Sequence, residues 1–153
     1  MSPAAEPGTR NPAEIVTSFL VALQENELDA ALELLTPDAV WINVSLPTVR
    51  GRDRIERVFR LGPKTGTHFR VHFHNVAAHG NVVLTERTDA LGRGRFEQRF
   101  WVYGRFELAD GRIKVWRDSF DWLDLLVSLV RGAAGALVPA LNRPWPGDRA
   151  AAT

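Results

Sequence analysis

The strongest constraint on the fold is a run of four strand-like segments in the second half of the chain. They span residues 68–76, 81–91, 95–108 and 112–120. The links between them are short, and Asp110-Gly111 in the last link is a good tight-turn signal. This spacing predicts antiparallel hairpins. A sheet of this kind must bury one face against helices.

The first sixty residues predict those helices. Asn11 can cap a helix, Pro12 suits its first position, and Glu14 completes a capping box. Two more helices and one strand follow before the hairpins, and another helix comes after them. We expect these helices at 28–35, 51–60 and 122–131, the strand at 40–46, and a loop at 62–66.

This order predicts an α+β fold in one domain, which suits a chain of 153 residues. We expect a domain at 11–141 between two tails, at 1–10 and 142–153. Its curved mixed or antiparallel sheet, three N-terminal helices and C-terminal helix should enclose an apolar pocket.

Composition excludes several functions. The chain has no cysteine, which rules out disulfides and thiolate chemistry and suits the cytoplasm. With 19 basic and 18 acidic residues, it lacks the positive charge of a nucleic-acid-binding protein. Charges at Asp121, Asp124 and Arg131 interrupt the apolar C-terminal stretch, so we expect no stable membrane insertion. That stretch should serve as a pocket lid or in a homodimer contact.

Strand alternation selects the side chains that share a face with the pocket. The first strand offers Trp41 and Asn43, and the last offers Trp116, Asp118 and Phe120. The strand between 81 and 91 offers Val83, Thr85, Arg87 and Asp89. If these faces line one cavity, it is aromatic and apolar with four polar groups: Asn43, Arg87, Asp89 and Asp118. We expect the others to position substrate and water: Trp41, Trp116, Phe120, Val83 and Thr85. Few polar groups in an apolar cavity are typical of a small-molecule site.

Two interpretations of these charges are open at this point. Spacing alone favours a solvated surface pair for Arg87 and Asp89, and such pairs contribute roughly 0–1 kcal/mol. If they are buried, however, two carboxylates beside one guanidinium can hold opposite protonation states. One carboxylate would then activate water while the other protonates a leaving oxygen. This chemistry needs neither a metal nor another cofactor.

Three segments together resemble the limonene-1,2-epoxide hydrolase family, within the NTF2-like and SnoaL-like superfamily. They are WINV (41–44), VLTERTDAL (83–91) and IKVWRDSFDW (113–122). The resemblance runs from about Asn11 to Leu141 and is greatest to the mycobacterial epoxide hydrolase branch. It implies a cone-shaped pocket and one-step addition of water to a lipophilic epoxide, which gives a vicinal diol.

The resemblance also implies a role for each polar residue. Asp118 matches the carboxylate that deprotonates water, Asp89 matches the acid, and Arg87 matches the arginine between them. Asn43 matches an amide that holds the water. Trp41 departs from the family pattern, which has tyrosine there. An indole N–H only donates a hydrogen bond, whereas a phenol also accepts one.

Other interpretations remain. A non-catalytic module that binds an apolar ligand or dimerises, and an isomerase or cyclase, would use the same scaffold. The protonation state of Asp89 is open, because burial favours its neutral form and Arg87 favours its anion. His68, His72 and His74 share a strand face, but the span from His68 to His72 is about 13 Å. We therefore favour a solvated outer face for them over a metal site.

Overall fold

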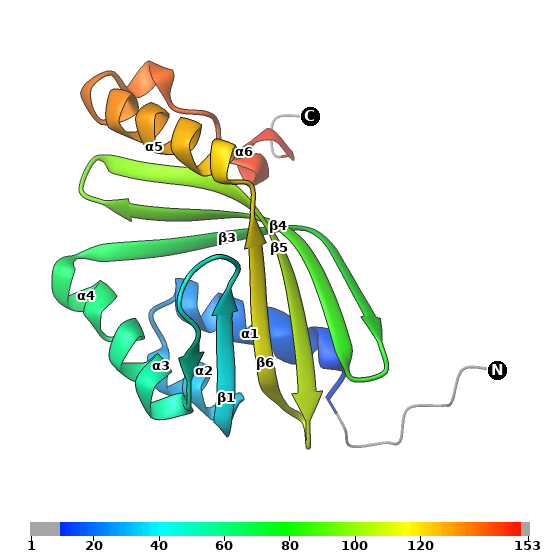
Figure 1. The fold of residues 1–153 in the computed structure, drawn as a ribbon. Coiled ribbons are helices and arrows are strands. Elements are labelled where there is room, and N and C mark those ends of the chain that lie inside the picture. Colours follow the sequence, from blue (N-terminus) through cyan, green and yellow to red (C-terminus); the bar gives the residue numbers. More distant parts are fainter. Residues whose placement is uncertain (1–9, 151–153) are drawn as a thin grey trace.

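The computed structural model describes residues 10–150 and contains one mixed sheet with helices (Figure 1). The strands are β1 (Leu35–Asn43), β2 (Val49–Arg50), β3 (Thr67–His79), β4 (Val82–Arg93), β5 (Phe96–Ala109) and β6 (Arg112–Phe120). The helices are α1 (Pro12–Gln24), α2 (Leu28–Glu33), α3 (Arg52–Phe59), α4 (Leu61–Thr65), α5 (Trp122–Leu137) and α6 (Pro146–Ala150), with a 3₁₀ turn η1 at Pro139–Leu141.

The strand order across the sheet is β2-β1-β6-β5-β4-β3. Strands β3 to β6 form three consecutive antiparallel pairs, as the short links predict. Strand β1 instead pairs in parallel with β6, the last strand in the sequence. This long-range pairing brings the N-terminal strand beside the segment that carries Asp118.

The hydrophobic core lies between the helices and the concave side of the sheet (Figure 1). Helix α1 contributes Phe19, which has no exposed surface, and Asn11 caps this helix through its side chain. Helix α3 contributes Ile55, and β5 contributes Phe106. The core therefore fixes α1 and α3 over the strands that carry the predicted site residues.

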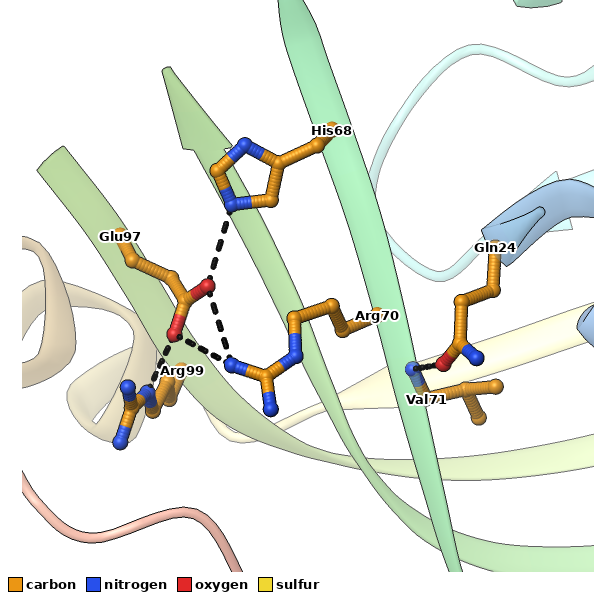
Figure 2. A network of polar contacts seen from close by, with 6 residues as sticks. All are labelled: Gln24, His68, Arg70, Val71, Glu97 and Arg99. Atoms are coloured by element: carbon orange, nitrogen blue, oxygen red, sulfur yellow. Dashed lines mark hydrogen bonds and ion pairs between the residues drawn. The ribbon is translucent and has the colours of Figure 1, made fainter. Parts of the chain in front are cut away.

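The convex side of the sheet carries a separate polar cluster (Figure 2). The carboxylate of Glu97 forms hydrogen bonds and ion pairs with His68, Arg70 and Arg99. His68, His72 and His74 of β3 lie on this side, away from Arg87, as alternation predicts. His72 and His74 are only partly exposed, however. Their rings meet edge-on, at 4.9 Å between centroids, and each covers part of the other.

Helix α5 packs against β5 through its small residues. Asp121 caps the helix, and Asp124 accepts a hydrogen bond from the backbone N–H of Trp101 at 2.9 Å. Buried Ser128 and Gly132 allow close packing, since a Cβ atom at Gly132 would lie 2.7 Å from the backbone oxygen of Glu97. Within residues 10–150, no helix is long and apolar enough to cross a membrane.

Two predicted boundaries near the N-terminal half are wrong. Strand β1 begins at Leu35 rather than at residue 40, because Leu35 pairs with Ile113 before an irregularity that contains Pro37. It ends at Asn43, and Ser45 turns the chain with a φ of 73°. The predicted loop at 62–66 contains helix α4, since Pro63 is tolerated in the first turn of a helix.

The C-terminal segment also differs from expectation. Helix α5 continues past Arg131 to Leu137. Residues 142–150 include α6 and Trp145, which is only 8% exposed and lies under the guanidinium of Arg70 at 4.0 Å. This part of the predicted tail therefore packs on the sheet. The N-terminal tail predicted at 1–10 lies outside the described residues except for Arg10.

Candidate active site

The predicted site residues fall into rows that cross the concave face of the sheet. One row carries Trp41, Trp116, Phe106 and Val83, in neighbouring positions on β1, β6, β5 and β4. The next row carries Asn43, Asp118, Gly104 and Thr85. A third row carries Phe120, Val102 and Arg87. Strand pairing therefore brings an aromatic row, a polar row and the arginine together.

The charged residues of this face are buried. Arg87 has no exposed surface, while Asp89 and Asp118 are 5% and 3% exposed. The surface-pair interpretation is therefore wrong for Arg87 and Asp89. Burial of an unpaired charge is very unfavourable, so the contacts among these groups determine whether the arrangement is stable.

Three nitrogens of Arg87 bind three different side chains. Nε donates to Asp89, at 2.9 Å to Oδ1 and 3.1 Å to Oδ2. Nη2 donates to Oδ2 of Asp118 at 2.6 Å, and Nη1 donates to Oγ1 of Thr85 at 3.0 Å. The guanidinium thus links the two carboxylates. Thr85 was predicted to face substrate or water, but its hydroxyl holds the arginine.

Gly104 is a site residue that the sequence analysis missed. Its position on β5 lies between Thr85 on β4 and Asp118 on β6, so the guanidinium of Arg87 crosses the sheet above it. A Cβ atom at Gly104 would lie 2.3 Å from Nη1 of Arg87 and 2.5 Å from Oγ1 of Thr85. A glycine inside an otherwise bulky strand indicates close approach by another group, and this is the signal in the sequence.

The aromatic row forms one wall of the site. The rings of Trp41 and Trp116 stack at 4.8 Å between centroids and 14° between planes. Phe106 continues the stack on the far side of Trp116, at 6.1 Å and 11°. Phe19 from α1 and Phe59 from α3 meet these rings edge-on. The indoles are therefore held from both the sheet and the helices.

The remaining predicted residues complete this lining. Val83 is fully buried in the core, and Phe120 contacts Phe100 edge-on at 5.9 Å. Asn43 lies beside Asp118 in register. Two surface hollows of about 400 and 500 Å³ lie elsewhere, and none of the predicted site residues lines either. Asp89 and Asp118 are nearly inaccessible to solvent in this arrangement.

The two carboxylates differ in their electrostatic environment. Burial raises the pKa of Asp89 from 3.8 to about 6, which outweighs the opposing effect of Arg87, and the negative charge of Asp118 adds to the rise. Burial also favours a lower pKa for Arg87, but Asp118 and Asp89 raise it above its usual value. Arg87 is thus a permanent cation, and Asp89 holds a proton in mildly acidic solution.

Comparison with known proteins identifies the family of this chain. The family model of the limonene-1,2-epoxide hydrolase catalytic domain matches residues 10–131. The chain belongs to the limonene-1,2-epoxide hydrolase family. The predicted family resemblance is therefore confirmed.

Similar proteins confirm both the mycobacterial likeness and the fold. Epoxide hydrolase EphG from Mycobacterium tuberculosis is 42% identical over 128 residues, which cover 83% of this chain and 85% of that protein. The structure of an LEH-like epoxide hydrolase from M. tuberculosis matches with a TM-score of 0.86 and 39% identity, over 92% of this chain and 100% of that one. An NTF2-like protein from Cytophaga hutchinsonii matches with a TM-score of 0.65 at 17% identity, over 79% of this chain and 99% of that one. The α+β, NTF2-like fold is thus confirmed.

No group of three or more metal-ligating side chains is present among the described residues. The catalytic roles of Asp118, Asp89, Arg87 and Asn43 stay predictions. What the geometry adds is that all four positions lie on one face and that three of them are joined by hydrogen bonds.

Substitution of Gly104 by alanine should destabilise the protein by about 1–3 kcal/mol, because the new methyl group forces Arg87 away from its partners. Urea denaturation measures this change. Gly62→Ala is the matched control, since a Cβ atom there would lie 3.8 Å from its nearest neighbour and the residue is helical. Equal stability of the two variants would contradict the close contact at Gly104.

Proposed function

We propose that this protein is an epoxide hydrolase that adds water to a lipophilic epoxide in one step. The observation that carries the proposal is the buried cluster in which Arg87 donates hydrogen bonds to both Asp89 and Asp118. The two M. tuberculosis relatives named above are epoxide hydrolases, which supports the same reaction here. Family membership and these hydrogen-bonded side chains support a mechanism of the limonene-1,2-epoxide hydrolase type.

Asp118 is the base in this proposal. Its Oδ2 accepts from Arg87, while its Oδ1 is buried and has no hydrogen-bond partner in the described part of the chain. Oδ1 is therefore available to take a proton from water. As that proton leaves, the water oxygen bonds to an epoxide carbon and the C–O bond at this carbon breaks. Asn43 lies opposite Asp118 in the strand pairing. Its side-chain amide, which has both a donor and an acceptor, forms a hydrogen bond with the same water.

Asp89 is the acid. It donates its proton to the epoxide oxygen as the ring opens, so that the product is a neutral diol. Arg87 keeps its own proton throughout and stabilises whichever carboxylate is ionised. After one turnover Asp118 holds a proton and Asp89 lacks one, and exchange with water restores the starting state. The reaction needs no cofactor.

The substrate should be apolar around its epoxide. Trp41, Trp116 and Phe120 surround the polar row and offer no charged partner to a substrate. A terpene-, fatty-acid- or sterol-like epoxide would suit such walls, since transfer of apolar surface out of water contributes to binding. Trp41 replaces the tyrosine expected in the family. Because its larger ring forms part of the aromatic wall, we expect the substrate range of this protein to differ from that of relatives with tyrosine.

Wild-type protein should convert lipophilic epoxides to diols that contain one oxygen from ¹⁸O-labelled water, as detected by mass spectrometry. Asp118→Asn should lower turnover by about 100-fold or more, because the amide cannot accept the proton. The fold should persist, because loss of the Asp118 charge favours ionisation of Asp89, which then neutralises Arg87. Glu107→Gln, at an exposed carboxylate of β5, serves as control.

Two outcomes would contradict this assignment. If no epoxide in a broad panel yields labelled diol, the protein is not an epoxide hydrolase of this class. If Asp118→Asn retains full turnover while circular dichroism shows a native fold, the base lies elsewhere.

The rate should also depend on the proton carried by Asp89. Because an acid acts only while protonated and the pKa of Asp89 is about 6, kcat/KM should fall about tenfold per pH unit above that value. The folded protein binds this proton more tightly than the unfolded chain does. The contribution of Asp89 to stability is therefore greatest below pH 4 and is lost as the pH rises through about 6. A flat rate profile from pH 5 to pH 8 would contradict the role of Asp89.

We propose that the protein forms a homodimer through α5. This helix buries its small residues and exposes large ones, with Leu123 at 69%, Leu126 at 59% and Val130 at 64%. An exposed apolar row of this kind is typical of an interaction surface. Light scattering should therefore give a dimer mass for the wild type.

Leu126→Glu combined with Val130→Glu should yield a monomer, because charges at both positions oppose burial of the row. Val21→Glu on α1, where the wild-type side chain is 42% exposed, is the control and should remain dimeric. A monomeric wild type would exclude the dimer.

We also expect the protein to act in the cytoplasm. The absence of cysteine supports a reducing compartment. Fractionation of the native cells with an antibody would test this expectation.

A further inference from the structure

The hollow of about 400 Å³ lies on the convex side of the sheet, away from the candidate active site. Strands β3, β4 and β5 form its floor, and α5 and the C-terminal segment around Pro144 form its rim. Thr88 lines the floor and stands between Arg87 and Asp89 in β4, so alternation points it away from both. The hollow is therefore a separate site, and its volume suits a small organic molecule.

The floor of this hollow consists of rings and one hydroxyl group. His72 on β3, Thr88 on β4 and Trp101 on β5 are neighbours in the strand pairing. The register between β3 and β4 shifts at His74, and such a bulge redirects a side chain. The His74 ring stacks on Trp101 at 4.3 Å between centroids, and its Nε2 lies 2.8 Å from Oγ1 of Thr88. The bulge thus brings a second imidazole onto the floor.

Two arginines supply positive charge at the hollow. Arg99 uses Nε to bind Glu97 at 2.5 Å, and its two Nη groups have no hydrogen-bond partner among the described residues (Figure 2). Arg143 is exposed and forms no ion pair with any side chain that the structure describes. Both residues line the hollow, and neither guanidinium can lose its proton.

The carboxylates near the hollow leave part of this charge unbalanced. Glu97 is already shared among three basic side chains. Asp124 lines the hollow and accepts a hydrogen bond from the backbone N–H of Trp101. Glu86 lies outside the lining, where the amide of Asn75 binds it at 2.5 Å. Two arginines therefore face one carboxylate in the lining, and this balance favours an anionic ligand.

The rim that carries Arg143 is held in place by its neighbour Trp145. The indole of Trp145 is buried and lies 4.0 Å below the guanidinium of Arg70, and His72 meets it edge-on at 6.2 Å between centroids. These contacts attach the C-terminal segment to the sheet. A ligand at the hollow therefore meets a rim that is already folded, which lowers the entropic cost of binding.

We propose that the hollow binds a small organic carboxylate that has a flat apolar body. Guanidinium groups bind carboxylates through paired N–H···O bonds, and Arg99 and Arg143 supply these donors. The body of the ligand lies against Trp101 and between Pro144 and Pro146. This inference is independent of epoxide hydrolysis, because no residue of the candidate active site lines the hollow.

Isothermal titration calorimetry with cinnamate tests the ligand class. Wild-type protein should bind it with a Kd of about 1 mM or below. Cinnamyl alcohol has the same flat body without the charge, and inorganic phosphate has charge without the body. Each should bind at least roughly tenfold more weakly than cinnamate. No binding of cinnamate, or equal affinity for either comparison compound, would overturn the proposal.

Variants test whether the two arginines hold the carboxylate. Arg99→Gln and Arg143→Gln should each weaken cinnamate binding roughly tenfold, because each removes a charge-assisted hydrogen bond. Arg57→Gln is the matched control, since Arg57 is exposed on α3 and lines the other hollow. Asp118→Asn should bind cinnamate like the wild type, whatever its turnover. Wild-type affinity in both arginine variants, with circular dichroism showing a native fold, would overturn the proposal.

Nuclear magnetic resonance identifies the site that cinnamate occupies. The indole N–H signal of Trp101 should shift on addition of cinnamate, because this ring lines the hollow. The signals of Trp41 and Trp116, which stack on the concave side, should stay in place. Shifts confined to Trp41 and Trp116 would locate the ligand in the candidate active site and overturn the proposal.

Discussion

Arg87 is a cation with no exposed surface, and the other groups of the site are arranged to neutralise it and to accept its hydrogen bonds. Removal of one partner from a buried pair costs about 3–5 kcal/mol, because the remaining charge is left uncompensated. The partners of Arg87 come from both β4 and β6. The guanidinium therefore crosses β5, and a side chain at Gly104 would block it. One buried cation thus constrains three strands.

The same constraint makes the two carboxylates unequal. Two ionised aspartates beside a single arginine would leave a net negative charge in the interior. Burial raises the pKa of Asp89 to about 6, and a proton on Asp89 removes one negative charge from the cluster. In the proposed reaction, this cation lies between the acid and the base. The stability of the buried cluster and its chemistry therefore depend on the same charge balance.

Much of this face was predictable from the sequence because alternation within a strand is rigid. Thr85, Arg87 and Asp89 share a face for that reason, as do Trp116 and Asp118. Alternation does not specify which strands are neighbours or whether a face is buried. The parallel pairing of β1 with β6 joins residues about 75 positions apart in the chain, and only that pairing puts Asn43 beside Asp118. Family resemblance supplied this relation, whereas local pattern did not.

Other features depend on contacts that local pattern cannot reveal. Trp145 lies in a Pro-rich stretch that resembles a tail, yet Arg70 on β3 covers its ring. Helix α5 continues through Gly132 and Gly135, although glycine has a low helix propensity. Its close approach to the backbone of β5 explains Gly132. In both cases a tertiary contact overrides the local preference.

The residue at position 41 contributes both to the packing of the site and to its hydrogen-bonding groups. The residue lies in the row of stacked rings, and the next row on the same strand carries Asn43 beside Asp118. A phenol at position 41 would place its hydroxyl at the end of a smaller ring, whereas the indole carries its N–H within a larger bicyclic system. The indole also contacts Phe59, so α3 helps to fix where its donor lies. A change at this position therefore alters both the shape of the wall and the place of a buried hydrogen-bond donor, and the packing of α3 helps to fix both.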